Sequence, residues 1–151
     1  MFYVKSVAEV DFECQNLPIL FCDKQFSHYY YFLMKENNAV SKFSAQTKIT
    51  PEVLETENFV VVGIDQYIGI WNVDNADVAK EINLISNFYS FKTYNKNLFI
   101  ICEINILVLD MHTLNVSWEE TFEEFIEDVD IQKNKAMINF INGVSETIFF
   151  D

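Results

Sequence analysis

Arginine is absent from this chain of 151 residues, and glycine and proline are scarce, with three and two copies. Arginine is the residue that proteins favour for paired contacts to phosphate. The formal net charge is −13, so the surface also repels phosphate groups. A nucleic acid or an anionic membrane surface is therefore not expected as a partner. If the partner of this protein is charged, we expect it to be basic.

Cysteine is scarce too, and its spacing is uninformative. Cys14, Cys22 and Cys102 are an odd number and form no CxxC pair, which does not suit a disulfide framework. No uncharged run approaches the roughly 20 residues that span a bilayer. Residues 1–13 carry several acidic side chains and lack the apolar segment of a secretory signal. These absences predict a cytoplasmic protein that does not contact the membrane.

Motifs that carry chemistry are missing as well. His28 and His112 are the two histidines, and neither stands in an HxH or HExxH pattern. The sequence contains no GxGxxG, GxxxxGK[ST] or GxSxG motif. The segment 74–77 resembles the start of a calcium loop but has no downstream glutamate, and it reads as a turn. We therefore expect neither an enzyme, nor a metal site, nor a cofactor.

What the chain has in abundance is short apolar runs separated by asparagine, aspartate and glycine. Residues 58–84 contain the runs 59–62 and 67–71 and a third apolar segment over 78–84. The apolar residues are largely β-branched or aromatic, and the breaks are residues that tolerate tight turns. This stretch predicts three strands joined by turns.

The same pattern returns about 39 residues later, over 97–102, 106–110 and 116–118, and a shorter copy follows over 136–151. A period near 40 with several strands per unit is typical of a β-propeller blade. The sequence therefore predicts an all-β fold, an antiparallel β-sandwich resembling half a β-propeller. The whole chain, 1–151, is expected to be one domain with blade-like repeats over 58–151.

Residues 1–57 are interpreted as a degenerate N-terminal blade. Strands are expected over 2–10 and 27–34, with a hairpin turn at Asn37-Asn38. Pro18 restricts the following apolar segment to an edge strand or to a strand start. Residues 44–57 are polar, and no element is assigned to them.

One segment, 118–129, fits two structures. Its apolar residues recur with helical spacing, which favours a short helix. The repeat instead aligns 116–122 and 126–131 with strands of the preceding copy, which favours strand, turn, strand. We prefer the strands and keep the helix as the alternative.

The same region holds a dense run of carboxylates. Seven fall within twelve residues: Glu119, Glu120, Glu123, Glu124, Glu127, Asp128 and Asp130. Neighbouring like charges on a surface cost a few tenths of a kcal/mol per pair, and a basic ligand would offset that cost. A solvated face without a partner explains the run equally well.

The blade patterns resemble a known group of proteins. The segments Asn58-Phe-Val-Val-Val-Gly, Tyr67-Ile-Gly-Ile-Trp-Asn, Asn97-Leu-Phe-Ile-Ile-Cys-Glu, Ile106-Leu-Val-Leu-Asp and Ser117-Trp-Glu, followed by the acidic run, are similar to small bacterial immunity proteins of contact-dependent growth-inhibition and polymorphic toxin systems. Some of these are β-sandwiches likened to half a β-propeller. The resemblance covers residues 58–151.

The resemblance implies a bacterial, cytoplasmic protein that binds one cognate toxin domain 1:1 and occludes its active site, the toxin being a basic nuclease of the ribonuclease type. It transfers no catalytic residues. From charge and residue type we expect the seven carboxylates to bind the partner, helped by Asp74 and Asp77. Tyr67 and Trp71 are expected to be exposed aromatic anchors. The alternative is a propeller-fragment scaffold or peptide-binding module that associates with copies of itself.

Overall fold

The computed structural model describes residues 1–23 and 25–150, and this part of the chain is almost entirely β-structure. The chain forms two compact units, Met1–Leu84 and Ile85–Asp151. The first contains β1 (Phe2–Val7), α1 (Glu9–Cys14), β2 (Ile19–Phe21), β3 (Tyr29–Lys35), β4 (Asn38–Ala45), β5 (Glu52–Glu55), β6 (Phe59–Ile64), β7 (Tyr67–Asn72) and β8 (Asp77–Asn83). The second contains β9 (Phe88–Tyr94), β10 (Asn97–Cys102), β11 (Asn105–Asp110), β12 (Val116–Thr121), β13 (Ile126–Gln132), β14 (Lys135–Phe140) and β15 (Ser145–Phe149).

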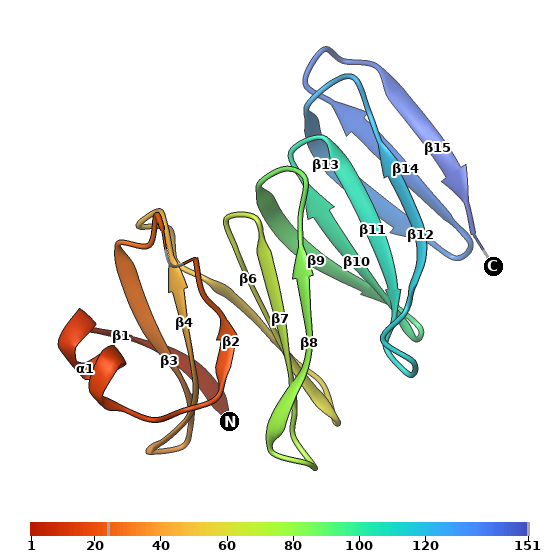
Figure 1. Ribbon diagram of the computed structural model, residues 1–151. Helices are drawn as coiled ribbons and strands as arrows, with labels where there is room; N and C mark the ends of the chain where they lie inside the picture. The colour runs from red at the N-terminus through yellow and green to blue at the C-terminus, as the bar shows by residue number, and fades with distance from the viewer. Residues whose placement is uncertain (24, 151) are drawn as a thin grey trace. The chain divides into compact units, whose positions relative to one another are not determined.

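The first unit has two four-stranded sheets, ordered β1-β3-β4-β2 and β5-β6-β7-β8 (Figure 1). The second sheet is an antiparallel meander, whereas β2 pairs parallel with β4. The apolar faces of both sheets share one core, formed by Phe2, Leu20, Phe21, Tyr31, Leu33, Phe43, Ala45, Val60, Val62, Ile64 and Trp71. The expected edge position after Pro18 is confirmed, because β2 ends its sheet. Its parallel direction was not expected.

β2 runs against β7 at a position where only glycine fits. A Cβ atom on Gly69 would overlap Leu20 Cγ and lie 2.8 Å from Phe21 Cδ1. Such an overlap is sterically forbidden, so β2 can pack against β7 only because Gly69 has no side chain. The strand glycine is thus a packing device of this unit.

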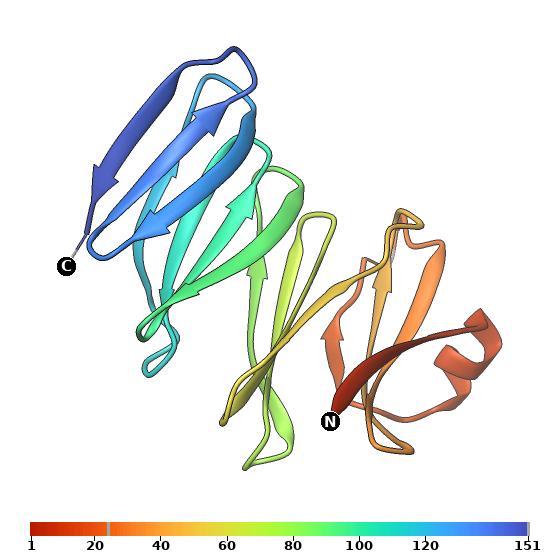
Figure 2. The same ribbon diagram turned by 180° about the vertical axis from the view of Figure 1, so that it is seen from behind.

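The second unit repeats the plan with β9-β10-β11-β12 and β13-β14-β15, all antiparallel (Figure 2). Its core is formed by Phe99, Ile101, Ile106, Val108, Phe122, Ile126, Val129, Ala136, Ile138 and Phe140. Most of these residues come from alternate positions on strands of both sheets, as expected for sheets that pack face to face, and Phe122 comes from the turn between β12 and β13. The all-β, propeller-like fold class is confirmed, and the single domain over 1–151 stays a prediction.

The repeat is confirmed. β6 and β7 match β10 and β11, since Phe59 pairs with Asn72 and Asn97 pairs with Asp110. The β14–β15 hairpin repeats them with one residue more. The segment 118–129 forms β12, a turn and β13, so the helical alternative was wrong. Its apolar spacing arises because one strand and the next both place side chains in the same core, with an irregular turn between them.

Two elements of the first fifty-seven residues escaped the sequence prediction. The expected strand over 2–10 ends at Val7, and α1 follows, with Phe12 as its buried residue. The Lys42 Nζ donates hydrogen bonds to the carbonyl oxygens of Phe12 (2.8 Å) and Gln15 (2.9 Å), so a lysine from β4 caps the last turn of α1. β5 lies in the polar segment 44–57, where two of its four residues are glutamates. A strand this short gives no readable alternation.

Candidate functional site

The structure divides the acidic run among several surfaces of the second unit. β12 carries Glu119 and Glu120, the turn over 122–125 carries Glu123 and Glu124, and β13 carries Glu127, Asp128 and Asp130. Successive side chains of a strand point to opposite faces, so neighbours in sequence are separated in space. Only part of the run converges on one place.

That place is a cavity of about 320 Å³ at the turn between β12 and β13. Four carboxylates line it, and we call it the acidic pocket: Glu120, Glu123, Glu124 and Glu146. Phe122 and Phe140 also line the pocket, with ring centroids 5.3 Å apart, and both are buried. Charged side chains thus stand beside a packed aromatic pair.

Backbone hydrogen bonds hold the turn that carries two of these carboxylates. The N–H of Phe122 donates to the carbonyl oxygen of Ile104 (2.7 Å), and the N–H of Ile126 donates to that of Glu103 (2.8 Å). On the other side, the N–H of Ile141 donates to the carbonyl oxygen of Phe125 (3.0 Å). The turn is therefore fixed to its neighbours at both ends, and the pocket is preformed.

The carboxylates of the acidic pocket are not neutralised from within the described chain. Among residues 1–23 and 25–150, none of the four forms an ion pair; the ion pair seen in the second unit joins Lys96 to Asp110 at 3.3 Å, away from this turn. Four like charges around one hollow create a negative potential there. Lysine or arginine side chains are the groups that such a pocket attracts most strongly.

Exposed apolar side chains stand next to the pocket. Phe125 belongs to its turn, and Ile141 and Val144 flank the turn between β14 and β15; their exposed fractions are 47%, 59% and 57%. We call these three residues the apolar rim. They expose apolar surface beside the pocket, which we had expected of Tyr67 and Trp71. Successive antiparallel strands alternate in direction, so the end of β12 and the start of β15 lie at the same end of the second unit. The order of the strands alone could therefore have predicted that Glu146 and the apolar rim lie beside the acidic turn.

The other carboxylates of the run have different surroundings. Asp128 accepts a hydrogen bond from Asn139 Nδ2 (2.6 Å), and Asn139 Oδ1 accepts one from Ser145 Oγ (2.6 Å), on the face of the last sheet that points away from its core. Asp130 shares this exposed face and accepts a hydrogen bond from Gln132 (3.2 Å).

Glu119 lies on a third surface. It pairs with Leu107 across the ladder and therefore shares the sheet face opposite to that of Glu120. There, burial, together with the carboxylates of Glu119 and Glu103, raises the pKa of the Cys102 thiol to about 12. Glu127 is exposed and does not line the acidic pocket. As partner-binding residues, these outlying carboxylates stay predictions.

The expected exposure of two aromatic residues was wrong. Trp71 is 3% exposed and belongs to the core of the first unit, because its position on β7 faces the neighbouring sheet. Tyr67 is half-buried, stacks on Phe21 with ring centroids 5.5 Å apart, and donates its hydroxyl to Asp23 Oδ2 at 2.9 Å. Burial, together with the carboxylate of Asp23, raises the pKa of Tyr67 to about 12. Both residues stabilise the fold, and Trp71 is not available as an anchor, whereas a role for Tyr67 in binding stays a prediction.

Asp74 and Asp77 are exposed but do not stand on a turn equivalent to the acidic one. They flank the turn that joins β7 to β8, the third and fourth strands of one sheet. The acidic turn joins the fourth strand of one sheet to the first strand of the next. One strand separates these two turns in the repeat, so they belong to opposite ends of a blade. A role for this pair in binding stays a prediction.

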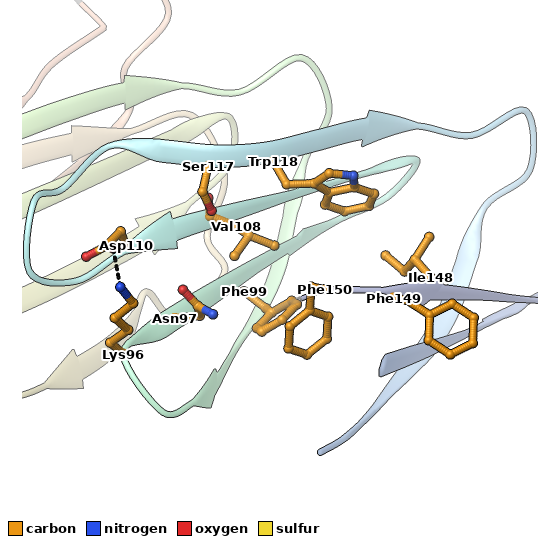
Figure 3. Close-up of a pocket in the computed structure, with 10 residues that line it drawn as sticks. All are labelled: Lys96, Asn97, Phe99, Val108, Asp110, Ser117, Trp118, Ile148, Phe149 and Phe150. Atoms are coloured by element: carbon orange, nitrogen blue, oxygen red, sulfur yellow. Dashed lines mark hydrogen bonds and ion pairs between the residues drawn. The ribbon is translucent and has the colours of Figure 1, made fainter. Parts of the chain in front are cut away.

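A second cavity of the second unit is mainly apolar, with a volume of about 370 Å³. Figure 3 shows Trp118 from β12 on one side and Ile148 from β15 on the other, with Phe99 beside Phe150. The rings of Phe99 and Phe150 meet edge to face at 5.0 Å. We call this the aromatic pocket.

The Lys96–Asp110 ion pair also lines the aromatic pocket (Figure 3). Hydrogen bonds from the N–H groups of His112 and Thr113, aided by Lys96, hold the pKa of Asp110 below its usual value. The ion pair stands beside the aromatic surface, so the pocket offers charge of both signs at its edge.

In the described residues, no group of three or more His, Cys, Asp and Glu side chains has the arrangement of a metal site. None of the helices among residues 1–23 and 25–150 is long and apolar enough to cross a membrane.

By sequence, the chain matches no protein-family model and none of the curated proteins. Solved structures resemble its fold. The computationally designed Ika4 protein matches with a TM-score of 0.60 at 11% identity, over 92% of this chain and 95% of that one. Sqt1 from Saccharomyces cerevisiae matches with a TM-score of 0.57 at 12% identity, over 81% of this chain and 39% of its own.

The β-propeller domain of Cps50 (Swd1) from Myceliophteria thermophila gives a TM-score of 0.50 at 13% identity, over 66% of this chain and 38% of its own. The chain thus spans about two fifths of the length of these two natural proteins. Likeness at such low identity concerns the fold alone. By fold, the chain is an all-β protein built from blades like those of a β-propeller.

Proposed function

We propose that this chain is an inhibitor that binds a basic protein domain, in the manner of an immunity protein that neutralises one cognate toxin. The observation that supports this most is the acidic pocket, where four carboxylates without an ion-pair partner in the described chain stand beside the exposed apolar rim. Charge steers the encounter of such surfaces, and a central apolar contact supplies lasting affinity.

A nuclease is the toxin class that this surface fits best. A nuclease cleft carries lysines and arginines that hold phosphate. The carboxylates of the acidic pocket would bind these basic side chains in place of phosphate and so occlude the cleft. Inhibition would be stoichiometric and would need no chemistry from the chain. In this proposal the protein acts in the bacterial cytoplasm by forming a 1:1 complex with its toxin.

The test is co-expression in bacteria with the toxic domain encoded beside this gene. We expect growth to be rescued and a 1:1 complex to be purified whose affinity falls as salt rises. The double substitution Glu123→Lys with Glu124→Lys should slow association about tenfold or more at low salt, because it removes the steering charge.

The matched control is Glu13→Lys with Glu57→Lys, two exposed glutamates of the first unit, which changes the net charge by the same amount. If both double variants slow association equally, net charge and not the acidic pocket drives binding. If no complex forms with the wild-type chain, the inhibitor proposal is rejected.

A further inference from the structure

The last sheet that the described residues form has three strands, β13, β14 and β15. Each of the other three sheets has four strands, and in the third sheet β12 pairs with β11 as the fourth. β15 takes the place of β11 in the repeat, and in the described residues no strand pairs with its second edge. One position for a strand is therefore open along Ser145–Phe149.

The open edge presents backbone groups in the correct spacing for pairing. The N–H of Phe140 donates to the carbonyl oxygen of Val144 (2.9 Å), and the N–H of Phe150 donates to that of Asn134 (2.9 Å). Because bonding alternates along an antiparallel ladder, the N–H and C=O groups of Ser145, Thr147 and Phe149 point away from β14.

β15 carries one feature by which proteins block such an edge, the charge of Glu146 on the side that faces the pockets. Its sequence, SETIF, contains no lysine and no proline, and its pairing with β14 shows no bulge. Phe149 is 75% exposed. An edge of this kind, with one carboxylate and an exposed aromatic residue, is suited to accept a strand whose charge complements Glu146.

Both pockets of the second unit lie along this vacant position. Glu146 of β15 and Glu120 of β12 line the acidic pocket, while Ile148 of β15 and Trp118 of β12 line the aromatic pocket. Glu146 and Ile148 share one face of β15, and Trp118 and Glu120 share one face of β12. A strand added to β15 would thus place alternate side chains into the two pockets.

We infer that the edge of β15 receives an extended segment of the basic partner as the fourth strand of the last sheet. An antiparallel strand places an apolar side chain opposite Ile148 and, two residues later, a lysine or arginine opposite Glu146. The recognised pattern is therefore apolar–any–basic. The nature of the partner rests on the function proposed above, whereas the open edge does not.

Charge argues against a second copy as the occupant. If two β15 strands paired about Thr147, Glu146 of one copy would stand opposite Ile148 of the other, which puts a carboxylate beside the aromatic pocket. No basic side chain would then reach the acidic pocket, and both copies carry a net charge of −13. A basic strand satisfies both pockets, and a copy of β15 satisfies neither.

The experiment uses the whole chain and the capped peptide Thr-Val-Ile-Thr-Lys-Val-Thr as a probe. We expect binding in solution NMR to shift the amide signals of Thr147 and Phe149 and to protect these two amides from hydrogen exchange. A peptide with Glu in place of Lys should bind about tenfold more weakly, because its carboxylate meets Glu146.

Thr147→Pro removes one outward N–H without breaking a bond to β14, since proline is tolerated at such edge positions. It should weaken peptide binding about tenfold or more, whereas the matched control Thr147→Val keeps the N–H and should bind as the wild type does. Unprotected amides, or equal binding by the Pro and wild-type chains, would overturn the inference. So would a wild-type dimer that Thr147→Pro dissociates, because the occupant would then be a second copy.

Co-expression with the toxin separates this inference from the proposed function. If Thr147→Pro still rescues growth and Glu123→Lys with Glu124→Lys does not, the acidic pocket binds the toxin. The toxin then does not add a strand to the edge of β15. If even the wild-type chain fails to rescue, the inhibitor proposal falls, and the peptide measurement still decides on the edge.

Discussion

Single side chains of the first unit carry polar roles that their burial makes costly to lose. Lys42 is 8% exposed, yet its ammonium group reaches two carbonyl oxygens of α1 and lies 4.5 Å from the centroid of the Phe12 ring. A buried charge is tolerated when it is hydrogen-bonded in this way. α1 has six residues and would not be stable alone, so its position depends on this contact.

Lys42→Met should therefore lower the free energy of unfolding by about 1–3 kcal/mol, because two carbonyl groups lose a charged donor. Urea denaturation followed by circular dichroism measures the change. Lys48→Met, at an exposed lysine, is the matched control and should change stability by less than about 0.5 kcal/mol. Equal stability of both variants would show that Lys42 does not hold α1.

Tyr67 gives a pH-dependent prediction at the same scale. Its pKa is raised to about 12 in the folded chain, from 10.0, by burial and by Asp23. A raised pKa means that the folded state holds the proton more tightly, so this contribution is complete below about pH 10 and is lost as the pH rises toward 12. Tyr67→Phe should remove that part of the pH dependence. The measurement is urea stability between pH 8 and pH 12, and an identical slope for both proteins would contradict the assignment.

At the scale of elements, the first sheet is completed by a strand that no repeat predicts. β2 pairs parallel with β4 and packs over Gly69 of β7. β2 can take this position because Gly69 has no side chain, and Leu20 and Phe21 fill that space. In the last sheet, by contrast, the corresponding fourth strand is missing from the described chain, and this difference leaves β15 open.

Gly69→Ala should destabilise the protein by about 1–3 kcal/mol, because the new methyl group overlaps Leu20 and the core must shift. Leu20→Ala should itself be destabilising by about 2–5 kcal/mol, through a cavity. In the double variant the two changes should offset each other in part, which a double-mutant cycle of unfolding free energies measures. Simple additivity would show that the two positions do not contact each other.

For the whole molecule, the dominant quantity is charge. The chain carries 23 acidic residues against 10 lysines, and residues 1–50 hold equal numbers of both, so the excess lies in the remainder. A net charge of this size disfavours association between copies and favours encounters with basic molecules. It also destabilises the compact state through repulsion between its own charges.

Sodium chloride should therefore raise the thermal midpoint of the free protein between low and moderate ionic strength, as screening reduces this repulsion. Differential scanning calorimetry measures the shift. The Glu123→Lys, Glu124→Lys variant should respond less to salt than the wild type, because each substitution changes the net charge by two units and the total falls from −13 to −9. An unchanged or falling midpoint would mean that attractive ion pairs outweigh the repulsion.

Much of the fold follows from local pattern. The runs of β6 and β7 return in β10 and β11, and strands with tight turns follow from β-branched and aromatic residues between asparagine, aspartate and glycine. The turn at Asn142-Gly143 is also predictable, since Gly143 adopts a φ of +86° that suits glycine. These features depend on neighbours in sequence, and local patterns record them.

The candidate site depends on contacts between distant residues, so the sequence predicted it only in part. The acidic run is visible as composition, but strand alternation turns Glu119 away from Glu120, and a hairpin brings in Glu146. Trp71 reads as an anchor by residue type, yet the neighbouring sheet buries it.

The sequence alone therefore determined the strands of residues 58–151, their repeat and the sign of the charge, because each is a property of adjacent residues. Only the tertiary structure decided which carboxylates share a pocket, which aromatic residues stay exposed and which strand lacks a neighbour. These properties arise when strands far apart in the chain lie side by side, and no local pattern encodes that neighbourhood.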